Sequence, residues 1–188
     1  MPSLIFLTGA VGVGKTTVAS LLAERGFHAL AFADPVKEIV KIAFNLEHQW
    51  LTDAYKNEQH PFWHMTPREM YQRVGTEAFQ TAFGSDIWIN NVQLRLRDLR
   101  IQKPDLDVVV TDVRPGKGGV QLEAAFARRH GTLVHVIGPS RREQTVQQLQ
   151  HSSNGPVPFE TGDIYLYNTG TVLELRQRVD ELVEKLHA

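Results

Sequence analysis

The residues with the clearest chemical meaning form the stretch GAVGVGKTT, which runs from Gly9 to Thr17 directly after an apolar run. It matches the phosphate-binding pattern G-x-x-x-x-G-K-[ST] through Gly9, Gly14, Lys15 and Thr16. Glycines let backbone N–H groups turn toward a phosphate, and the dipole of the following helix adds partial positive charge. A lysine in this position reaches the β- and γ-phosphates of a nucleoside triphosphate, and the hydroxyl after it binds Mg²⁺. The stretch therefore predicts a site for ATP with magnesium.

A second group of polar residues follows other apolar runs. Asp34 and Lys37 come after the run FHALAFA. Asp112 and Arg114 lie at the end of the run DLDVVVTD, and an aspartate closing a buried strand beside a P-loop is the usual second anchor for Mg²⁺. The alternative for Asp112 is a cap or turn residue, and for each basic residue it is a solvated surface position. We expect Lys37, Arg68 and Arg114 to meet beside the glycine turn.

Apolar periodicity predicts the elements that position these residues. Five apolar runs are typical of strands, at 3–8, 27–33, 105–112, 132–138 and 163–168. Amphipathic segments predict helices over 15–26, 34–44, 66–83, 86–100, 121–131 and 171–186. Two of these helices begin with capping boxes, Thr66 with Glu69 and Thr171 with Glu174. Alternating strands and helices indicate a parallel sheet covered on both faces, with ligands at the carboxyl ends of its strands.

Composition bounds the class of protein. The chain has 188 residues, which suits one domain, and 42% of them are hydrophobic. A formal net charge of −1 argues against nucleic acid and against an anionic membrane as partners. There are no cysteines, which excludes disulfides and thiolate metal sites and suits a cytoplasmic location. No apolar run approaches the roughly 20 residues of a membrane span, and the first residues lack the basic segment of a signal peptide.

Several blocks together resemble a known family, the deoxynucleoside monophosphate kinases of tailed bacteriophages. The resemblance lies in the P-loop and in FADPVKEIV, TPREMYQRVGTEAFQTAFGSDIWINN, VVVTDVR, GTLVHVIGP and HSSNGPVP…GDIYLYNTGTVLEL. It implies an α/β fold, the P-loop NTPase three-layer sandwich, with a five-stranded parallel sheet, helices on both faces and a mobile lid. It also implies the Mg²⁺-dependent reaction ATP + dNMP → ADP + dNDP in the cytoplasm, which is the host cytoplasm if a phage encodes the protein. The resemblance leaves open whether the protein forms a homodimer.

The resemblance also implies a domain layout. Residues 1–188 form a single kinase-like domain, with a core of 1–44, 66–138 and 162–188. Residues 45–65 form an irregular insertion on the acceptor side, and residues 139–161 form the lid.

The same resemblance assigns roles to individual positions. The residues implied to bind ATP are Gly12, Val13, Gly14, Lys15, Thr16, Thr17 and the lid residue Arg141. Those implied to bind the dNMP are Asp34, Lys37, Arg68, Gln72, Gly75, Thr76, Trp88, Asp112, Arg114 and Glu123. Catalysis is implied for Lys15, Arg68, Asp112 and Arg114, and metal binding for Thr16 and Asp112.

Two departures from the family pattern concern the site. The link PGKGGVQL before Glu123 is longer and richer in glycine than in the family, which bears on the match of that glutamate. Asn154 stands where many relatives carry an acid.

Other functions compete with this interpretation. The N-K-x-D motif of GTPases is absent. A dephospho-coenzyme-A-kinase-like enzyme would share the P-loop and would use Asp34 as the base for a hydroxyl acceptor. A nucleotide-binding module without catalysis is a further alternative, against which the basic residues on the acceptor side argue. A nucleic-acid end kinase is disfavoured by the near-neutral charge.

Overall fold

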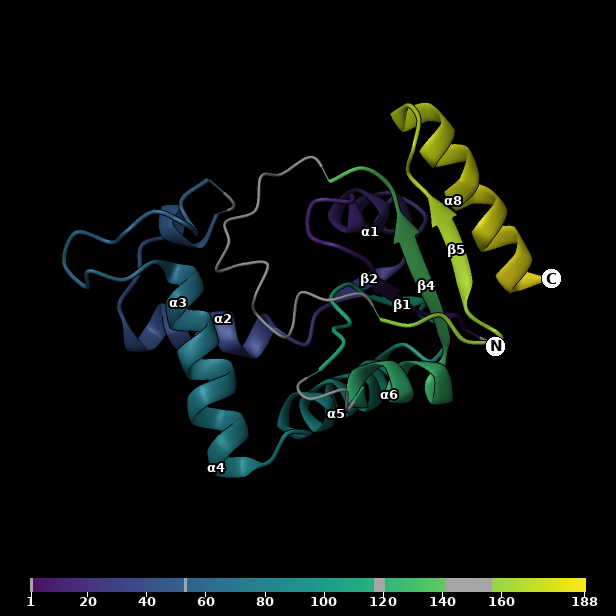
Figure 1. Ribbon diagram of the computed structural model, residues 1–188. Helices are drawn as coiled ribbons and strands as arrows, with labels where there is room; N and C mark the ends of the chain where they lie inside the picture. Colours follow the sequence, from purple (N-terminus) through teal and green to yellow (C-terminus); the bar gives the residue numbers. More distant parts are fainter. Residues whose placement is uncertain (1, 53, 117–120, 141–156) are drawn as a thin grey trace. The chain divides into compact units, whose positions relative to one another are not determined.

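The computed structural model describes residues 2–52, 54–116, 121–140 and 157–188 (Figure 1). They form two compact units. The sheet unit comprises Met1–Ala31 and Val92–Ala188, and the helical unit comprises Phe32–Asn91. The expected layout of core, insertion and lid stays a prediction, and residues 141–156 of the expected lid lie outside the described residues.

Five parallel strands form the centre of the sheet unit, in the order β2-β3-β1-β4-β5. Their bounds are β1 Leu4–Thr8, β2 His28–Leu30, β3 Val108–Val110, β4 Thr132–Ile137 and β5 Ile164–Tyr167. The predicted five-stranded parallel sheet is therefore confirmed. Strands β2 and β3 are shorter than the apolar runs that predicted them. For β2 the reason is that the chain already turns at Phe32 and Ala33, just before α2.

Helices cover both faces of this sheet. Alternate residues of β1 point to opposite faces, so Ile5 and Leu7 pack with α1 (Lys15–Ala23) and α8 (Val172–His187) in one buried cluster. Helix α8 runs alongside β5 (Figure 1). Phe6 points the other way and meets Phe126 of α6 (Leu122–His130) edge to face at 5.8 Å. The Val92–Gln102 part of α5 (Ile87–Gln102) belongs to the sheet unit as well. All five residues of β1 are buried, as expected of a central strand covered on both sides.

A buried polar network ties α6 to the sheet. The guanidinium of Arg128 donates to both carboxylate oxygens of Asp163 at 3.0 and 2.8 Å, and it also contacts Glu160. Nε2 of His135 on β4 lies 2.8 Å from the same carboxylate. Burial alone would raise the pKa of Asp163, but these hydrogen bonds and the N–H of Glu160 lower it to about 2. The carboxylate therefore stays charged and paired at neutral pH.

The helical unit is built around two helical segments. Helix α2 spans Asp34–Ala43, and a longer segment consists of α3 (Pro67–Gln72), the π-helix η2 (Arg73–Gln80) and α4 (Thr81–Phe83). The predicted helix over 66–83 is confirmed in its limits, and its middle is π-helical. The capping box at its start is present, because Thr66 Oγ1 accepts from Glu69 N at 3.1 Å and Glu69 Oε2 accepts from Thr66 N at 2.7 Å. The second capping box, at the start of α8, is present too.

Residues 45–65 are mostly irregular, as predicted, and contain one short 3₁₀-helix, η1 (His48–Leu51). Their aromatic side chains pack against the helices of the same unit. Trp63 donates from Nε1 to the carbonyl of Phe44 at 2.9 Å, and the two rings meet edge to face. Trp50 packs on the cluster around Met70. These tryptophans therefore serve as packing residues of the helical unit. Among the described residues, no helix combines the length and the apolar character that a membrane span requires.

Candidate nucleotide-binding site

The P-loop occupies the turn between β1 and α1 in the sheet unit. Gly9, Gly12 and Gly14 have φ angles of 141°, 81° and 99°, a region that favours glycine. Gly14 is the N-cap residue of α1, and as a glycine it has no side chain with which to cap the helix. The first N–H groups of α1 and the positive end of its dipole therefore point toward the turn. This is the geometry that binds phosphate.

Lys15 folds back over the loop. Its Nζ donates to the carbonyl oxygens of Gly9 at 2.8 Å and Ala10 at 2.9 Å. These contacts hold the ammonium group above the turn. A phosphate bound by the loop would meet this charge directly.

Neighbouring atoms, as well as the φ angles, disfavour a side chain at two glycines of the loop. A Cβ on Gly9 would lie 2.5 Å from the carbonyl oxygen of Val136, and one on Gly14 would lie 2.3 Å from Nδ2 of Asn168. A side chain at Gly9 would therefore clash with backbone, and one at Gly14 would have to displace the buried amide of Asn168.

Asn168 is a functional candidate that the sequence did not single out. It follows β5 directly, its side chain is buried, and its Nδ2 donates to the carbonyl of Val13 at 2.8 Å. Its backbone N–H donates to Ile137 at the end of β4 at 2.6 Å. The signal that could have found it is its position, since a polar residue at the carboxyl end of a parallel strand lies at the edge where the P-loop lies.

The segment after β3 lies next to the P-loop because β3 pairs with β1. Thr8 donates from Oγ1 to the carbonyl of Val113 at 3.1 Å, and Val113 N–H donates to the carbonyl of Leu7 at 3.1 Å. The half-buried Asp112 is therefore held at the same edge of the sheet as the exposed Thr16, the first hydroxyl of α1. A carboxylate and a hydroxyl are oxygen ligands of the kind that Mg²⁺ prefers. The residues present thus fit a magnesium ion.

Glu123 joins this cluster from the first turn of α6. Its Oε2 accepts a hydrogen bond from Arg114 N at 2.7 Å. Burial and then the negative charge of Asp112 raise the pKa of Glu123 to about 8, against the opposing effects of the Arg114 N–H and guanidinium. The structure therefore brings Asp112, Arg114 and Glu123 together, despite the long link before Glu123.

The acceptor-side residues of the helical unit are placed as follows. Asp34 and Lys37 form an ion pair at 3.8 Å on α2. Arg68 lies on α3 and donates from Nη1 to Asn57 Oδ1 at 3.3 Å. Gln72 and Thr76 are half-buried in α3 and η2.

Gly75 and Trp88 form a packed pair. Gly75 is buried in η2, where a Cβ would press on Val36 at 3.2 Å. Trp88 is 7% exposed and donates from Nε1 to the carbonyl of Gly75 at 2.9 Å. Within its unit Trp88 therefore supports the π-helix, and its expected contact with a base or sugar stays a prediction. Arg141 and Asn154 lie outside the described residues.

Comparisons with known proteins define the fold. No sequence profile of a known family matches the chain, and no curated protein matches it. Solved structures do match. TT1252 from Thermus thermophilus has a TM-score of 0.59 at 19% identity, over 98% of this chain and 97% of that one. A dephospho-CoA kinase from Campylobacter jejuni has a TM-score of 0.53 at 12% identity, over 98% and 97%.

A gluconokinase from Sinorhizobium meliloti has a TM-score of 0.50 at 15% identity, over 99% of this chain and 96% of that one. Likeness at such low identity shows the fold. The chain has the fold of P-loop kinases, a parallel five-stranded sheet with helices on both faces and a phosphate-binding turn after its central strand. The expected α/β P-loop architecture is therefore confirmed, and the resemblance to the phage kinases stays a prediction.

Proposed function

We propose that the protein transfers a phosphoryl group from ATP to a deoxynucleoside monophosphate, giving ADP and a dNDP in the cytoplasm. The observation that carries the proposal is the pairing of a complete P-loop with the Asp112, Arg114 and Glu123 cluster at the end of the neighbouring strand. The resemblance to the phage enzymes adds the choice of acceptor. ATP and the dNMP are the partners of this proposal, and a homodimer is left open.

The chemistry explains why so many cations are assigned to the site. A phosphate monoester has a second pKa of about 6, so the acceptor is largely a dianion at neutral pH. Its oxygen needs no general base to attack. Catalysis is then mainly positioning and the neutralisation of charge. In our proposal Lys15 binds the phosphates of ATP, and Lys37, Arg68 and Arg114 bind the phosphate of the acceptor.

The proposed reaction also requires Mg²⁺. The hydroxyl of Thr16 and the carboxylate of Asp112 would hold the ion, which supplies positive charge to the β- and γ-phosphates when it is bound. Glu123 accepts a hydrogen bond from the backbone N–H of Arg114. This contact would position the segment that carries Asp112.

A hydroxyl acceptor is the second candidate. The fold shared with a dephospho-CoA kinase fits such an acceptor equally well. In that case Asp34 would be the base that takes the proton of the hydroxyl. Asp34 lies on the first turn of α2 and pairs with Lys37 at 3.8 Å.

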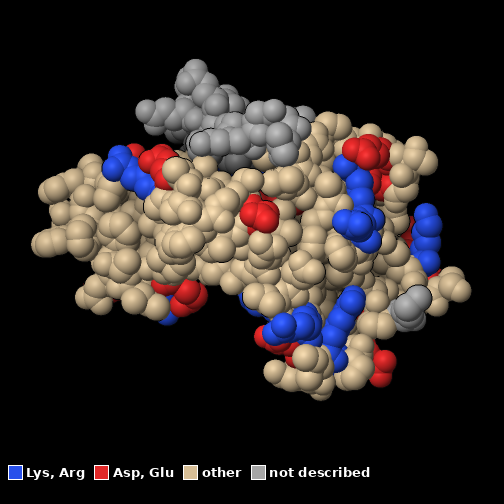
Figure 2. Space-filling view, turned by 90° about the horizontal axis from the view of Figure 1, so that it is seen from below, with Lys and Arg blue, Asp and Glu red and all other residues tan. Residues whose placement is uncertain are grey.

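Nucleic acid is a poor candidate for the acceptor. The net charge is −1, and on the face that Figure 2 presents, basic side chains lie in small groups next to acidic ones. A long polyanion is bound by a continuous basic surface instead.

An acceptor panel tests the proposal. The protein is incubated with labelled ATP, Mg²⁺ and, separately, the four dNMPs, the four ribonucleoside monophosphates and dephospho-coenzyme A. We expect label on one or more dNMPs. Transfer only to dephospho-coenzyme A would support the hydroxyl-acceptor alternative. ATP binding by calorimetry without any transfer would support the non-catalytic alternative. Lys15→Ala is the control variant, and we expect it to lose about two or more orders of magnitude in turnover.

A further inference from the structure

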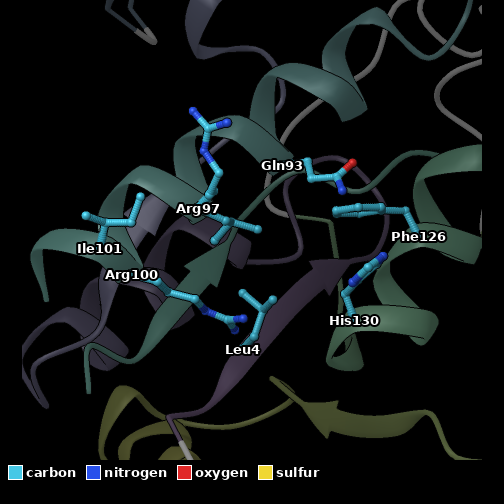
Figure 3. A pocket seen from close by; sticks show the side chains of 8 residues that line it. Leu4, Gln93, Arg97, Arg100, Ile101, Phe126 and His130 are labelled. Carbon is cyan, nitrogen blue, oxygen red and sulfur yellow. The ribbon is translucent and has the colours of Figure 1, made fainter. Parts of the chain in front are cut away.

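A hollow lies in the sheet unit, at the opposite end of β1 from the P-loop. It is lined by Leu4, the first residue of β1, whereas the P-loop follows Thr8, the last one. Its other walls come from α5 and α6, and its volume is about 410 Å³ (Figure 3). This is within the range of pockets that bind small molecules. The hollow is therefore a separate feature at the amino-terminal edge of the sheet.

The lining divides into an apolar part and a cationic part. The apolar side chains are Leu4, Leu96, Ile101 and Phe126. The polar side chains are Gln93, Arg97, Arg100 and His130, and no carboxylate of the described residues belongs to the lining. An apolar surface edged by positive charge is complementary to a molecule that has an apolar body and an anionic group.

The polar groups have few partners of their own. Within the described parts of the chain, the guanidinium of Arg100 and the side-chain amide of Gln93 make no hydrogen bond and no ion pair. His130 contacts the ring of Phe126, with ring centroids 4.4 Å apart. Figure 3 shows Arg100 extending toward Leu4, and Gln93 beside Phe126. Arg97 instead pairs with the adjacent Asp98 at 2.8 Å. Arg100 is thus the cation available to an anion in the hollow.

We propose that this hollow binds a small molecule with a flat apolar body and one anionic group, such as a sulfonate or a phosphate ester. The body would rest on Leu4, Leu96 and Phe126. The anionic group would accept hydrogen bonds from Arg100, and the amide of Gln93 would contact the body at its other end, beside Phe126. Arg100 and His130 also lie in the last turns of their helices, where a cation stabilises the helix end. The experiment must therefore separate ligand binding from helix stability.

The probe is 8-anilinonaphthalene-1-sulfonate, and N-phenyl-1-naphthylamine is its neutral partner with the same apolar body. Fluorescence titrations are run on the full chain with saturating ATP and Mg²⁺, so that the P-loop is filled. We expect the sulfonate to bind more tightly than the neutral compound. Cross-peaks of the Gln93 side-chain amide should shift with the sulfonate in an NMR titration. Sulfonate binding that is seen without ATP and Mg²⁺ but is lost in their presence would overturn the proposal.

Two variants and a control test whether the sulfonate group of the probe binds beside Arg100. Arg100→Gln removes the charge, and we expect the dissociation constant of the sulfonate to rise about tenfold, with little change for the neutral compound. Ile101→Glu places a negative charge at the rim, at a position 73% exposed that the fold should tolerate, and it should weaken the sulfonate as well. Arg129→Gln, on the exposed surface of α6 outside the lining, is the matched control. Equal sulfonate affinity in all three variants, at unchanged thermal stability, would overturn the proposal.

Discussion

The side-chain amide of Asn168 donates a 2.8 Å hydrogen bond to the carbonyl of Val13, inside the P-loop. Asn168 follows β5, which is an outer strand of the sheet. Its amide occupies the space that a Cβ on Gly14 would need. The turn that we assign to ATP is therefore held from two strands away in the sheet. We infer that Asn168 is a positioning residue for this turn.

Replacing this amide should loosen the turn without removing any phosphate ligand. Asn168→Asp is nearly isosteric but cannot donate to Val13, and it brings a negative charge toward the phosphate site. We expect the dissociation constant of a fluorescent ATP analogue to rise about tenfold or more, because a buried hydrogen bond is lost and a like charge is added.

Binding of the acceptor shows whether the effect of Asn168→Asp is specific to ATP. The KM of the dNMP should change little. Asn90→Asp, an exposed asparagine on α5, serves as the control. Equal losses of ATP affinity in both variants would refute a positioning role for Asn168.

Two glycines with similar φ angles should respond differently to replacement by alanine. Gly14 has a φ of 99° and would clash with Asn168, whereas Gly26 has a φ of 90° and open space around it. Both variants should lose about 1 kcal/mol of stability through the backbone alone. Only Gly14→Ala should also lose ATP binding, measured by calorimetry. Normal ATP binding by Gly14→Ala would mean that Asn168 moves aside and that the contact is not restrictive.

Arg68 tests the acceptor site. In our proposal it contacts only the acceptor phosphate, so Arg68→Ala should lower kcat/KM for the dNMP by about two orders of magnitude or more, as the loss of a charge-assisted contact predicts. The affinity for ATP should stay nearly unchanged. Asn57→Ala removes one hydrogen-bond partner of the Arg68 guanidinium and leaves the cation, so it is the matched control. Full activity of Arg68→Ala would show that the acceptor site is wrongly assigned.

The network around Asp163 predicts a pH dependence of stability. Its folded-state pKa is about 2, below the ordinary 3.8, so its contribution is present above about pH 4 and is lost as the pH falls through 2. Asp163→Asn should therefore lower the free energy of unfolding by about 2 kcal/mol at pH 6. The difference from the wild type should shrink between pH 4 and pH 2.

Urea unfolding at pH 6, 4 and 3 measures this difference. Asp98→Asn removes an exposed carboxylate that pairs only with Arg97 in the ion pairs described, and it should show a much smaller effect at every pH. A difference for Asp163→Asn that does not change with pH would contradict the assigned cause.

The local features of this fold follow from the sequence. The P-loop and both capping boxes need only residues a few positions apart, and all are where the sequence predicts them. The π-helical middle of the segment after Thr66 was not predicted, because its residue pattern is also compatible with an α-helix.

The contacts that position the site join distant parts of the chain. Asn168 and Val13 are 155 residues apart, and Arg128 and Asp163 are 35 apart. No periodicity or motif links such pairs, since only the order of the strands brings them together. The sequence could therefore predict the phosphate turn but not the residues that support it.

The outer strands of the sheet are both short. Among the described residues β2 has three and β5 has four, and the carbonyl of Tyr167 on β5 already accepts a hydrogen bond from Arg178 at 2.7 Å. Unpaired strand edges are templates on which further chains can add, and brevity is one of the ways proteins avoid this. The protein should accordingly resist aggregation by strand addition at high concentration, and any dimer it forms should use helical surfaces.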